Sequence, residues 1–258
     1  MTRHSDNMRR DWDERARQDA FKYIASWRED WDEASFFESG EQDYLRFVDP
    51  FLQRIQFAPA TKSMAELGSG IGRMTRSFAR RFGSVFAIDI SREMQERAKK
   101  LLASYPNIRW ILSDGESSLS IEDNSVDFIF SYLVLQHMPN RAVLFASIAE
   151  MLRVLRPEGV FLFQFNGSVQ PTMNWKGRAI SGILDSFSSL GLQRLSKFLA
   201  RSFGIDPGMI GKTWRGAALS TKEIAQAVTA ARGNPEGFLD PNTPFTWCYG
   251  SKGLRSSS

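Results

Sequence analysis

The stretch SMAELGSGIGR, residues 63–73, decides the fold of this chain. A short apolar run ends in an acidic residue, three alternating glycines follow, and residues 71–82 then repeat apolar side chains at helical spacing. The pattern predicts a buried strand, a tight turn and a helix, which together open a nucleotide-binding α/β unit. Glycine suits such a turn because it permits positive φ and lets a ligand lie against bare backbone.

The glycine spacing indicates which ligand the turn accepts. The dinucleotide fingerprint G-x-G-x-x-G needs a glycine at position 73, but that residue is Arg73, and the third glycine falls one residue early at Gly72. Glu66 lies just before the turn, and its negative charge would repel a pyrophosphate. A ligand that carries an ammonium, a sulfonium and a ribose fits this turn better.

Five segments resemble, in order, the motifs of the class I (Rossmann-like) S-adenosylmethionine-dependent methyltransferases. They are AELGSGIGRMT (65–75), VFAIDIS (85–91), ILSDG (111–115), VDFIFSYLVLQHMPN (126–140) and RVLRPEGVFLFQF (153–165). Five ordered matches are far more specific than a lone glycine pattern. The resemblance implies S-adenosyl-L-methionine as cofactor and methyl transfer as activity. It also implies a doubly wound, mostly parallel seven-stranded sheet with helices on both faces.

The resemblance implies roles for residues at the ends of the strands. Asp89 would accept hydrogen bonds from the ribose hydroxyls, Glu66 would hold the methionine end, and Asp114 would take the adenine amino group. Arg73 could face the methionine carboxylate or solvent, and Met94 could cover the adenine or only pack its helix. The whole set expected at the cofactor is Glu66, Gly68, Ser69, Gly70, Gly72, Arg73, Asp89, Ile90, Met94, Ser113, Asp114, Gly115, Ser131 and Leu133.

His137 is the candidate catalytic residue. It follows the fourth expected strand, where the family places side chains between cofactor and acceptor. Methyl transfer rests largely on alignment, and a base is needed only if the acceptor must lose a proton. A neutral imidazole could supply that base near neutral pH, and the alternative is that His137 bonds a loop carbonyl and shapes the site. The candidates for an aromatic acceptor pocket, each also a candidate for the core, are Trp12, Trp27, Trp31, Trp175 and Trp214.

The chain divides around this core. We expect an N-terminal helical cap over residues 1–57 and the cofactor-binding core over 58–165. A helical insertion or lid over 166–210 would precede the sixth strand, and the last strands and helix would occupy 211–250, before a flexible tail at 251–258. The cap could cover the open end of the cofactor site or only form a helical edge of the domain.

The expected elements follow from apolar periodicity and helix caps. The strands are 63–67, 84–89, 108–113, 126–132 and 159–165. The resemblance implies two more, which we place near 213–219 and 244–250. Residues 5–26, 29–39 and 41–57 are expected to form two or three helices, with a kink or restart at Pro50. The other helices are 71–82, 92–105, 140–155 and 220–231, with two more within 175–203. Three of them have capping residues, at Ser91, Asn140 and Ser220, and Ser39-Gly40 is expected to break the chain.

Composition narrows the function classes. The single Cys248 and the absence of an apolar N-terminal signal or spanning run favour a cytoplasmic protein. The net charge is +4, but the basic residues are scattered and interleaved with acidic ones, so nucleic acid is not the expected partner. Two histidines and one cysteine offer no metal site. We expect a small-molecule acceptor, at oxygen slightly ahead of nitrogen. A non-catalytic cofactor-binding protein and a protein or nucleic-acid methyltransferase are the alternatives, and the oligomeric state stays open.

Overall fold

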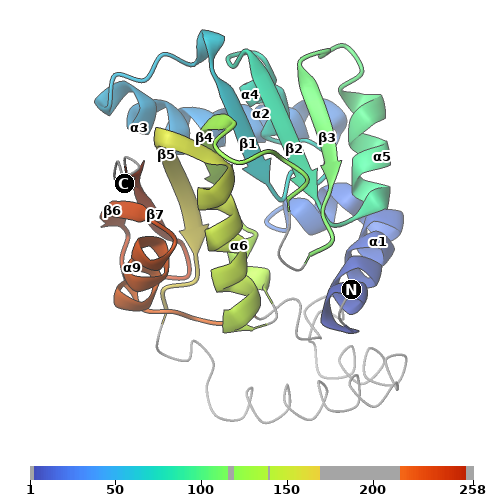
Figure 1. Ribbon diagram of the computed structural model, residues 1–258. Helices are drawn as coiled ribbons and strands as arrows, with labels where there is room; N and C mark the ends of the chain where they lie inside the picture. The colour runs from blue at the N-terminus through green and yellow to red at the C-terminus, as the bar shows by residue number, and fades with distance from the viewer. Residues whose placement is uncertain (1–2, 116–118, 139, 169–215, 254–258) are drawn as a thin grey trace.

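Seven strands form one sheet in the computed structural model, which describes residues 3–115, 119–138, 140–168 and 216–253. The strands are β1 Ser63–Leu67, β2 Ser84–Asp89, β3 Ile108–Leu112, β4 Val126–Ser131, β5 Leu155–Phe165, β6 Gly233–Leu239 and β7 Thr246–Lys252. Their order is β3-β2-β1-β4-β5-β7-β6, and only β7 pairs antiparallel, with both β5 and β6. The expected doubly wound, mostly parallel seven-stranded sheet is confirmed (Figure 1).

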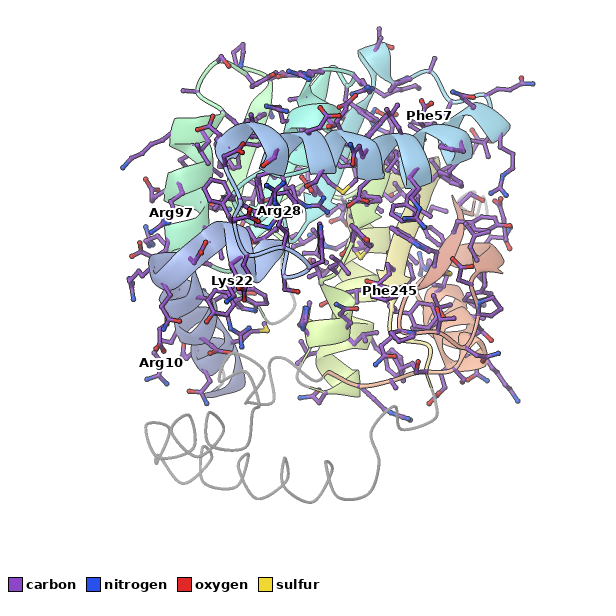
Figure 2. All side chains as sticks on the ribbon, turned by 180° about the vertical axis from the view of Figure 1, so that it is seen from behind. Arg10, Lys22, Arg28, Phe57, Arg97 and Phe245 are labelled. Atoms are coloured by element: carbon purple, nitrogen blue, oxygen red, sulfur yellow. The ribbon has the colours of Figure 1, made fainter. Side chains whose placement is uncertain are left out.

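Helices cover both faces of this sheet. The α-helices are α1 Arg3–Ile24, α2 Glu33–Asp43, α3 Asp49–Arg54, α4 Thr75–Ala79, α5 Arg92–Leu101, α6 Arg141–Val154 and α9 Thr221–Ala230. Three shorter helical segments are also described. They are the π-helix η1 at Tyr44–Val48 and the 3₁₀ turns η2 at Pro59–Thr61 and η3 at Leu135–His137. Seen from behind, α2 and α3 lie across one face, while α6 and α9 lie on the other (Figures 1 and 2).

Each face of the sheet has its own hydrophobic core because successive strand residues point to opposite sides. Phe128 of β4 packs with Phe36 of α2 and Phe78 of α4 on one face. Its neighbour Ile129 packs with Ile148 of α6 and Val228 of α9 on the other. Every residue of β4 is buried, as a parallel strand covered on both faces requires.

The helix starts predicted from capping residues are confirmed. The Ser91 hydroxyl accepts from the backbone N of Met94 at 3.1 Å, and Asn140 Oδ1 accepts from Val143 at 3.0 Å. Ser220 and Glu223 form a complete capping box at the start of α9. Each cap satisfies backbone donors that have no partner within the helix.

The helix expected over 71–82 is shorter than predicted. Residues 71–74 form turns that continue the glycine loop, and α4 begins only at Thr75. The apolar face is nevertheless confirmed, since Ile71, Met74, Phe78 and Phe82 are all buried. The helix expected over 92–105 likewise ends early, at Leu101. Apolar spacing therefore gave the buried side chains correctly and the helix length incorrectly.

The chain break expected at Ser39-Gly40 is wrong, because α2 runs through both residues. Gly40 is buried, and a Cβ there would lie 2.0 Å from the carbonyl oxygen of Arg73. The glycine therefore serves close packing of α2 against the backbone after the glycine turn. Its role depends on a residue 33 positions away, which local sequence patterns do not show.

The strand expected over 213–219 is also wrong. The described part of that range, from Gly216, contains no strand, and its backbone N–H groups bond loops at Gln136 and Asn166 instead. The sixth strand is β6, after α9, and it contains Pro235 next to an irregularity in the pairing. Because β6 is an edge strand, it tolerates a proline that would argue against a central strand.

The C-terminal tail and the insertion before the sixth strand are described only in part. The flexible tail expected over 251–258 begins too early, because Ser251 and Lys252 belong to β7. The Lys252 Nζ bonds Asn124 Oδ1 and the carbonyl of Leu155, each at 2.7 Å. Of the insertion expected over 166–210, all but the first three residues lie outside the described residues, as do Trp175 and Trp214. No helix in the described ranges is long and apolar enough to cross a membrane.

Candidate functional site

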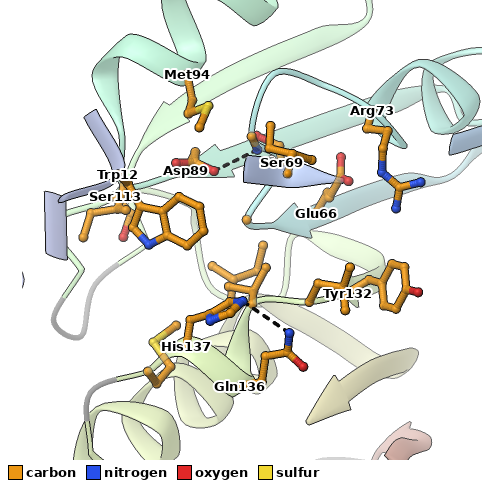
Figure 3. A pocket seen from close by; sticks show the side chains of 18 of the residues that line it. Trp12, Glu66, Ser69, Arg73, Asp89, Met94, Ser113, Tyr132, Gln136 and His137 are labelled. Atoms are coloured by element: carbon orange, nitrogen blue, oxygen red, sulfur yellow. Dashed lines mark hydrogen bonds between the residues drawn. The ribbon is translucent and has the colours of Figure 1, made fainter. Parts of the chain in front are cut away.

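A cavity of about 440 Å³ lies at the carboxyl ends of the parallel strands (Figure 3). Its wall includes Leu67 at the end of β1, Asp89 at the end of β2, Ser113 after β3 and Tyr132 after β4. Polar groups from separate strands meet here because parallel strands end at the same edge of the sheet.

The glycine turn forms one wall of this cavity. Gly68 and Gly70 have φ of 80° and 54°, a conformation that favours glycine. A Cβ on Gly68 would lie 2.0 Å from Val134 Cγ2, so the turn also needs the space that glycine leaves. Between them, Ser69 is 3% exposed, and its hydroxyl has no hydrogen-bond partner among the residues that the structure describes. A buried hydroxyl without a partner at a cavity wall indicates that a ligand supplies the partner.

Asp89 lies beside this turn because β2 pairs with β1. Its Oδ2 accepts from the backbone N of Gly70 and its Oδ1 from that of Ser91, both at 2.8 Å (Figure 3). Burial raises the pKa of Asp89 to about 6, and the backbone donors partly oppose the rise. The carboxylate is thus rigidly held at the strand end, in position to accept hydrogen bonds from a ligand's hydroxyl groups.

Glu66 is a second buried carboxyl at the cavity wall. It is 5% exposed, and the Thr75 hydroxyl donates to its Oε2 at 2.5 Å. Burial raises the pKa of Glu66 to about 8, while Thr75 and the nearby Arg73 lower it. Burial therefore favours the neutral carboxyl, and a ligand ammonium beside it would stabilise the charged form.

Arg73 does not face solvent, because it is 4% exposed. Its guanidinium forms an ion pair with Asp43 of α2 at 2.7 Å. It also lies 5.2 Å from the ring centroid of Trp27 and 5.9 Å from that of Tyr132. The arginine thus brings a fixed positive charge, bordered by two aromatic rings, to the cavity wall.

His137 lies in η3, after β4, and is 9% exposed, so it is not a plain surface histidine. Its Nε2 lies 3.2 Å from Nε2 of the adjacent Gln136 (Figure 3). The Trp12 ring meets the imidazole edge-on, with 5.7 Å between centroids. His137 and Trp12 therefore bring α1 and the segment after β4 together at one side of the cavity.

Helix α1 contacts the ends of β2 and β3 through polar contacts. The Arg9 guanidinium donates to the carbonyl of Ser113 at 3.1 Å, and Ser91 Oγ donates to Asp13 at 2.6 Å. At Asp19 the helix breaks, with φ −165° and ψ 94°, so that its last turn changes direction. The cavity lining contributed by α1 and the residues after it is Met8, Trp12, Tyr23, Ile24, Ser26 and Trp27.

The structure brings most of the predicted cofactor residues together. Those that line the cavity are Glu66, Gly68, Ser69, Gly70, Arg73, Asp89, Ile90, Met94, Ser113, Gly115 and Leu133, together with His137. Gly72, Asp114 and Ser131 do not line it. Ser131 instead donates to the carbonyl of Leu67 at 3.1 Å and so joins β4 to β1.

Sequence reasoning missed much of the remaining wall. Tyr132, Val134, Gln136 and Met138 line the cavity, and their position after the fourth strand could have indicated them. Leu67 and Met74, on either side of the glycine turn, were also missed. The other missed residues are Met8, Tyr23, Ile24, Ser26, Leu119, Ser147, Glu150 and Phe245. Nothing in their local patterns distinguishes them, because they reach the cavity from elements far apart in the sequence. Of the aromatic candidates, Trp12 and Trp27 line the cavity, whereas Trp31 packs on Phe36.

Residues 65–163, the strands and turns that build this cavity, match a protein-family model described as a methyltransferase domain. The core of this chain is thus similar to a methyltransferase domain and has the sheet order expected for the class I S-adenosylmethionine-dependent methyltransferases. The cavity fits S-adenosylmethionine, the cofactor that the resemblance implies. The Asp89 carboxylate suits a ribose diol, Glu66 suits an ammonium, and the buried Ser69 hydroxyl, without a partner in the described ranges, could bond a ligand.

Relatives and solved structures agree on this domain. The chain is 32% identical over 129 residues to phosphoethanolamine N-methyltransferase 1 of Triticum aestivum, covering 49% of this chain and 26% of the relative. It is 30% identical over 154 residues to 2-methyl-6-phytyl-1,4-hydroquinone methyltransferase of a Synechocystis strain, covering 57% and 47%. The chain thus spans less than half the length of either relative.

The fold is shared with magnesium protoporphyrin IX methyltransferase of Synechocystis, solved with S-adenosylhomocysteine bound. The TM-score is 0.57 at 15% identity, over 95% of this chain and 97% of that one. At this identity the match supports the fold and not a shared acceptor.

Proposed function

We propose that this protein transfers the methyl group of S-adenosylmethionine to a small-molecule acceptor with an apolar or aromatic body. The observation that carries the proposal is that one cavity joins the glycine turn to an aromatic wall. Trp12, Trp27, Tyr132 and Phe245 belong to that wall, and His137 lies among them. A volume of about 440 Å³ falls within the range of small-molecule sites, which is roughly 300–1,000 Å³.

The two relatives support a small acceptor. Their names specify phosphoethanolamine and a methylated phytyl hydroquinone as substrates. These acceptors differ widely in charge and size, so the relatives do not fix the acceptor of this chain. The apolar wall described above favours a molecule of the hydroquinone kind over a phosphorylated amine.

We place oxygen ahead of nitrogen as the acceptor atom because the described wall offers a protonated amine little counter-charge. Glu150 lines the cavity, but both its oxygens bond the Arg153 guanidinium at 2.9 Å. Glu66 and Asp89 belong to the cofactor end. The charge of Arg73 is likewise balanced, by Asp43 at 2.7 Å, so these paired groups leave little net charge for a charged acceptor.

The mechanism needs alignment and exclusion of water more than proton transfer. When bound, S-adenosylmethionine supplies a methyl group that is already electrophilic, attached to a positively charged sulfur. Asp89, Glu66 and the glycine turn would orient the cofactor, and the aromatic wall would orient the acceptor in a dry cavity. His137 is the proposed contact on the acceptor side.

The test has two stages. Calorimetry should show binding of S-adenosylmethionine and S-adenosylhomocysteine to the wild type and to the surface control Asp30→Asn, and loss of most binding in Asp89→Ala. Methyl-labelled cofactor is then incubated with a panel of phenols, aromatic carboxylic acids and aromatic amines, and label transfer is measured. Label should appear preferentially on oxygen acceptors. Firm cofactor binding without acceptor-dependent transfer across the panel would instead support a non-catalytic cofactor-binding protein.

A further inference from the structure

We propose that Gln164 and Gln136 form an amide relay that holds His137 as a neutral ring with its single proton on Nδ1. The relay is a property of the folded chain. Its consequence for catalysis rests on the proposed function. The inference follows from which groups can donate and which can accept, starting from two backbone groups whose roles are fixed.

The first link is Gln164, a fully buried residue of β5. The backbone N–H of Leu133 donates to its Oε1 at 3.0 Å, and its Nε2 donates to the carbonyl of Pro244 at 2.7 Å. A backbone N–H can only donate and a carbonyl can only accept. The orientation of the Gln164 amide is therefore determined by its partners, although oxygen and nitrogen of an amide are hard to tell apart by shape.

The second link is Gln136. The Gln164 Nε2 carries two hydrogens, and the second is donated to Gln136 Oε1 at 3.1 Å. The oxygen of the Gln136 amide thus faces Gln164, and its NH₂ group faces the imidazole. The Gln136 Nε2 lies 3.2 Å from His137 Nε2. Since an amide NH₂ can only donate, His137 Nε2 must accept.

A histidine whose Nε2 accepts a hydrogen bond carries no proton on that nitrogen, so the proton of the neutral ring is on Nδ1. Protonation of Nε2 would set an N–H against the NH₂ of Gln136. Reversal of the Gln136 amide would only move the conflict, because its NH₂ would then face the NH₂ of Gln164. A protonated, charged ring is therefore disfavoured in either orientation of the Gln136 amide.

In the described part of the chain, the charged and titratable groups that share the cavity with His137 are Tyr23, Glu66, Arg73, Asp89, Tyr132 and Glu150. The ionisable carboxyls and the arginine among them have partners of their own. Glu66 bonds Thr75, Asp89 bonds backbone N–H groups, Arg73 pairs with Asp43, and Glu150 bonds Arg153. Among the described residues, the hydrogen-bond contact of Nε2 is the one with Gln136.

Two consequences follow for the proposed reaction. The Nε2 lone pair is already engaged, so it does not remove a proton from the acceptor, and the general-base role suggested by sequence is replaced by a positioning role. Gln164 acts through Gln136 and is itself a positioning residue. It also holds the backbone of Leu133, a cavity residue with φ 60°, in a conformation that is uncommon outside glycine.

The direct test is the tautomer of His137 in protein labelled with ¹⁵N-histidine. The chain has two histidines, so His4→Gln assigns the signals. Long-range ¹H–¹⁵N spectra of the wild type should show a protonated Nδ1 and a bare Nε2, unchanged from pH 6 to pH 8. In Gln136→Glu the carboxylate can only accept, so Nε2 should become protonated. The control Gln42→Glu, at an exposed position of α2, adds the same charge and should match the wild type.

A wild-type ring protonated at Nε2 in this range, or a Gln136→Glu spectrum like that of the wild type, would overturn the relay. Gln164→Glu should give mixed tautomers, because a carboxylate cannot donate to Gln136. Gln136 is only half-buried, so its variant preserves the test if Gln164→Glu does not fold. For an acceptor that transfers label, kcat of the wild type should not follow a histidine titration, whereas kcat of Gln136→Glu should. A clear Nδ1–H signature without any methyl transfer would leave the relay intact and remove the proposed function.

Discussion

Glu66 gives a quantitative prediction about stability and pH. Its carboxyl is buried, and burial raises its pKa from 4.5 to about 8. Between these two values the folded chain holds one proton that the unfolded chain releases. Because the pKa is raised in the folded state, the contribution of Glu66 to the unfolding free energy is fully present below about pH 4.5. This contribution is lost as the pH rises through about 8.

The perturbation is Glu66→Gln, which keeps the shape and still accepts from the Thr75 hydroxyl. The wild type should lose up to about 1.4 kcal/mol of unfolding free energy per pH unit across the interval, and on the order of 3 kcal/mol at most between pH 5 and pH 8. The variant should lack this loss. Asp89 adds a change of the same sign, but it is present in both proteins and cancels in the comparison.

The assay is urea unfolding at pH 5 and pH 8 without cofactor, with the exposed Glu29→Gln as control. From pH 5 to pH 8, the wild type should lose about 1–3 kcal/mol more unfolding free energy than Glu66→Gln. The control should follow the wild type. Equal pH dependence in Glu66→Gln and the wild type would show that Glu66 is ionised in the folded chain, and the account of its burial would fail.

Three other substitutions test the site. Asp89→Ala should weaken binding of S-adenosylmethionine and its demethylated product by about 1–3 kcal/mol, measured by calorimetry, because the ribose hydroxyls lose their acceptor; unchanged affinity would mean that another group holds the ribose. Gly68→Ala should lower the melting temperature and reduce cofactor affinity, because its Cβ would lie 2.0 Å from Val134 and φ is 80°; wild-type values of both would refute the packing account. Asp43→Asn should destabilise the fold by about 3–5 kcal/mol in urea unfolding, since it leaves the buried Arg73 charge uncompensated, and a loss under 1 kcal/mol would show that the aromatic rings suffice.

Local patterns in the sequence were enough for the central part of the fold. Strands β1 to β4, the glycine turn and three helix caps were predicted because each depends on neighbouring residues, through apolar periodicity, positive φ or a side chain bonding the next turn. Asp89 could be placed beside the turn for the same reason. A strand that follows β1 through one helix pairs with it in parallel, so both strands end at the same edge.

Tertiary structure decided the features whose causes lie far apart along the chain. Position 40 of α2 is glycine because the backbone of Arg73 passes too close for a Cβ. Strand β6 tolerates Pro235 because it lies at the edge of the sheet. The same holds for the amide relay. Nothing local indicates that Gln164 bonds Gln136, 28 positions earlier, or the carbonyl of Pro244, 80 positions later. The sequence by itself determined a glycine turn suited to a cofactor, and only the packing of distant segments determined how the histidine beside it is held.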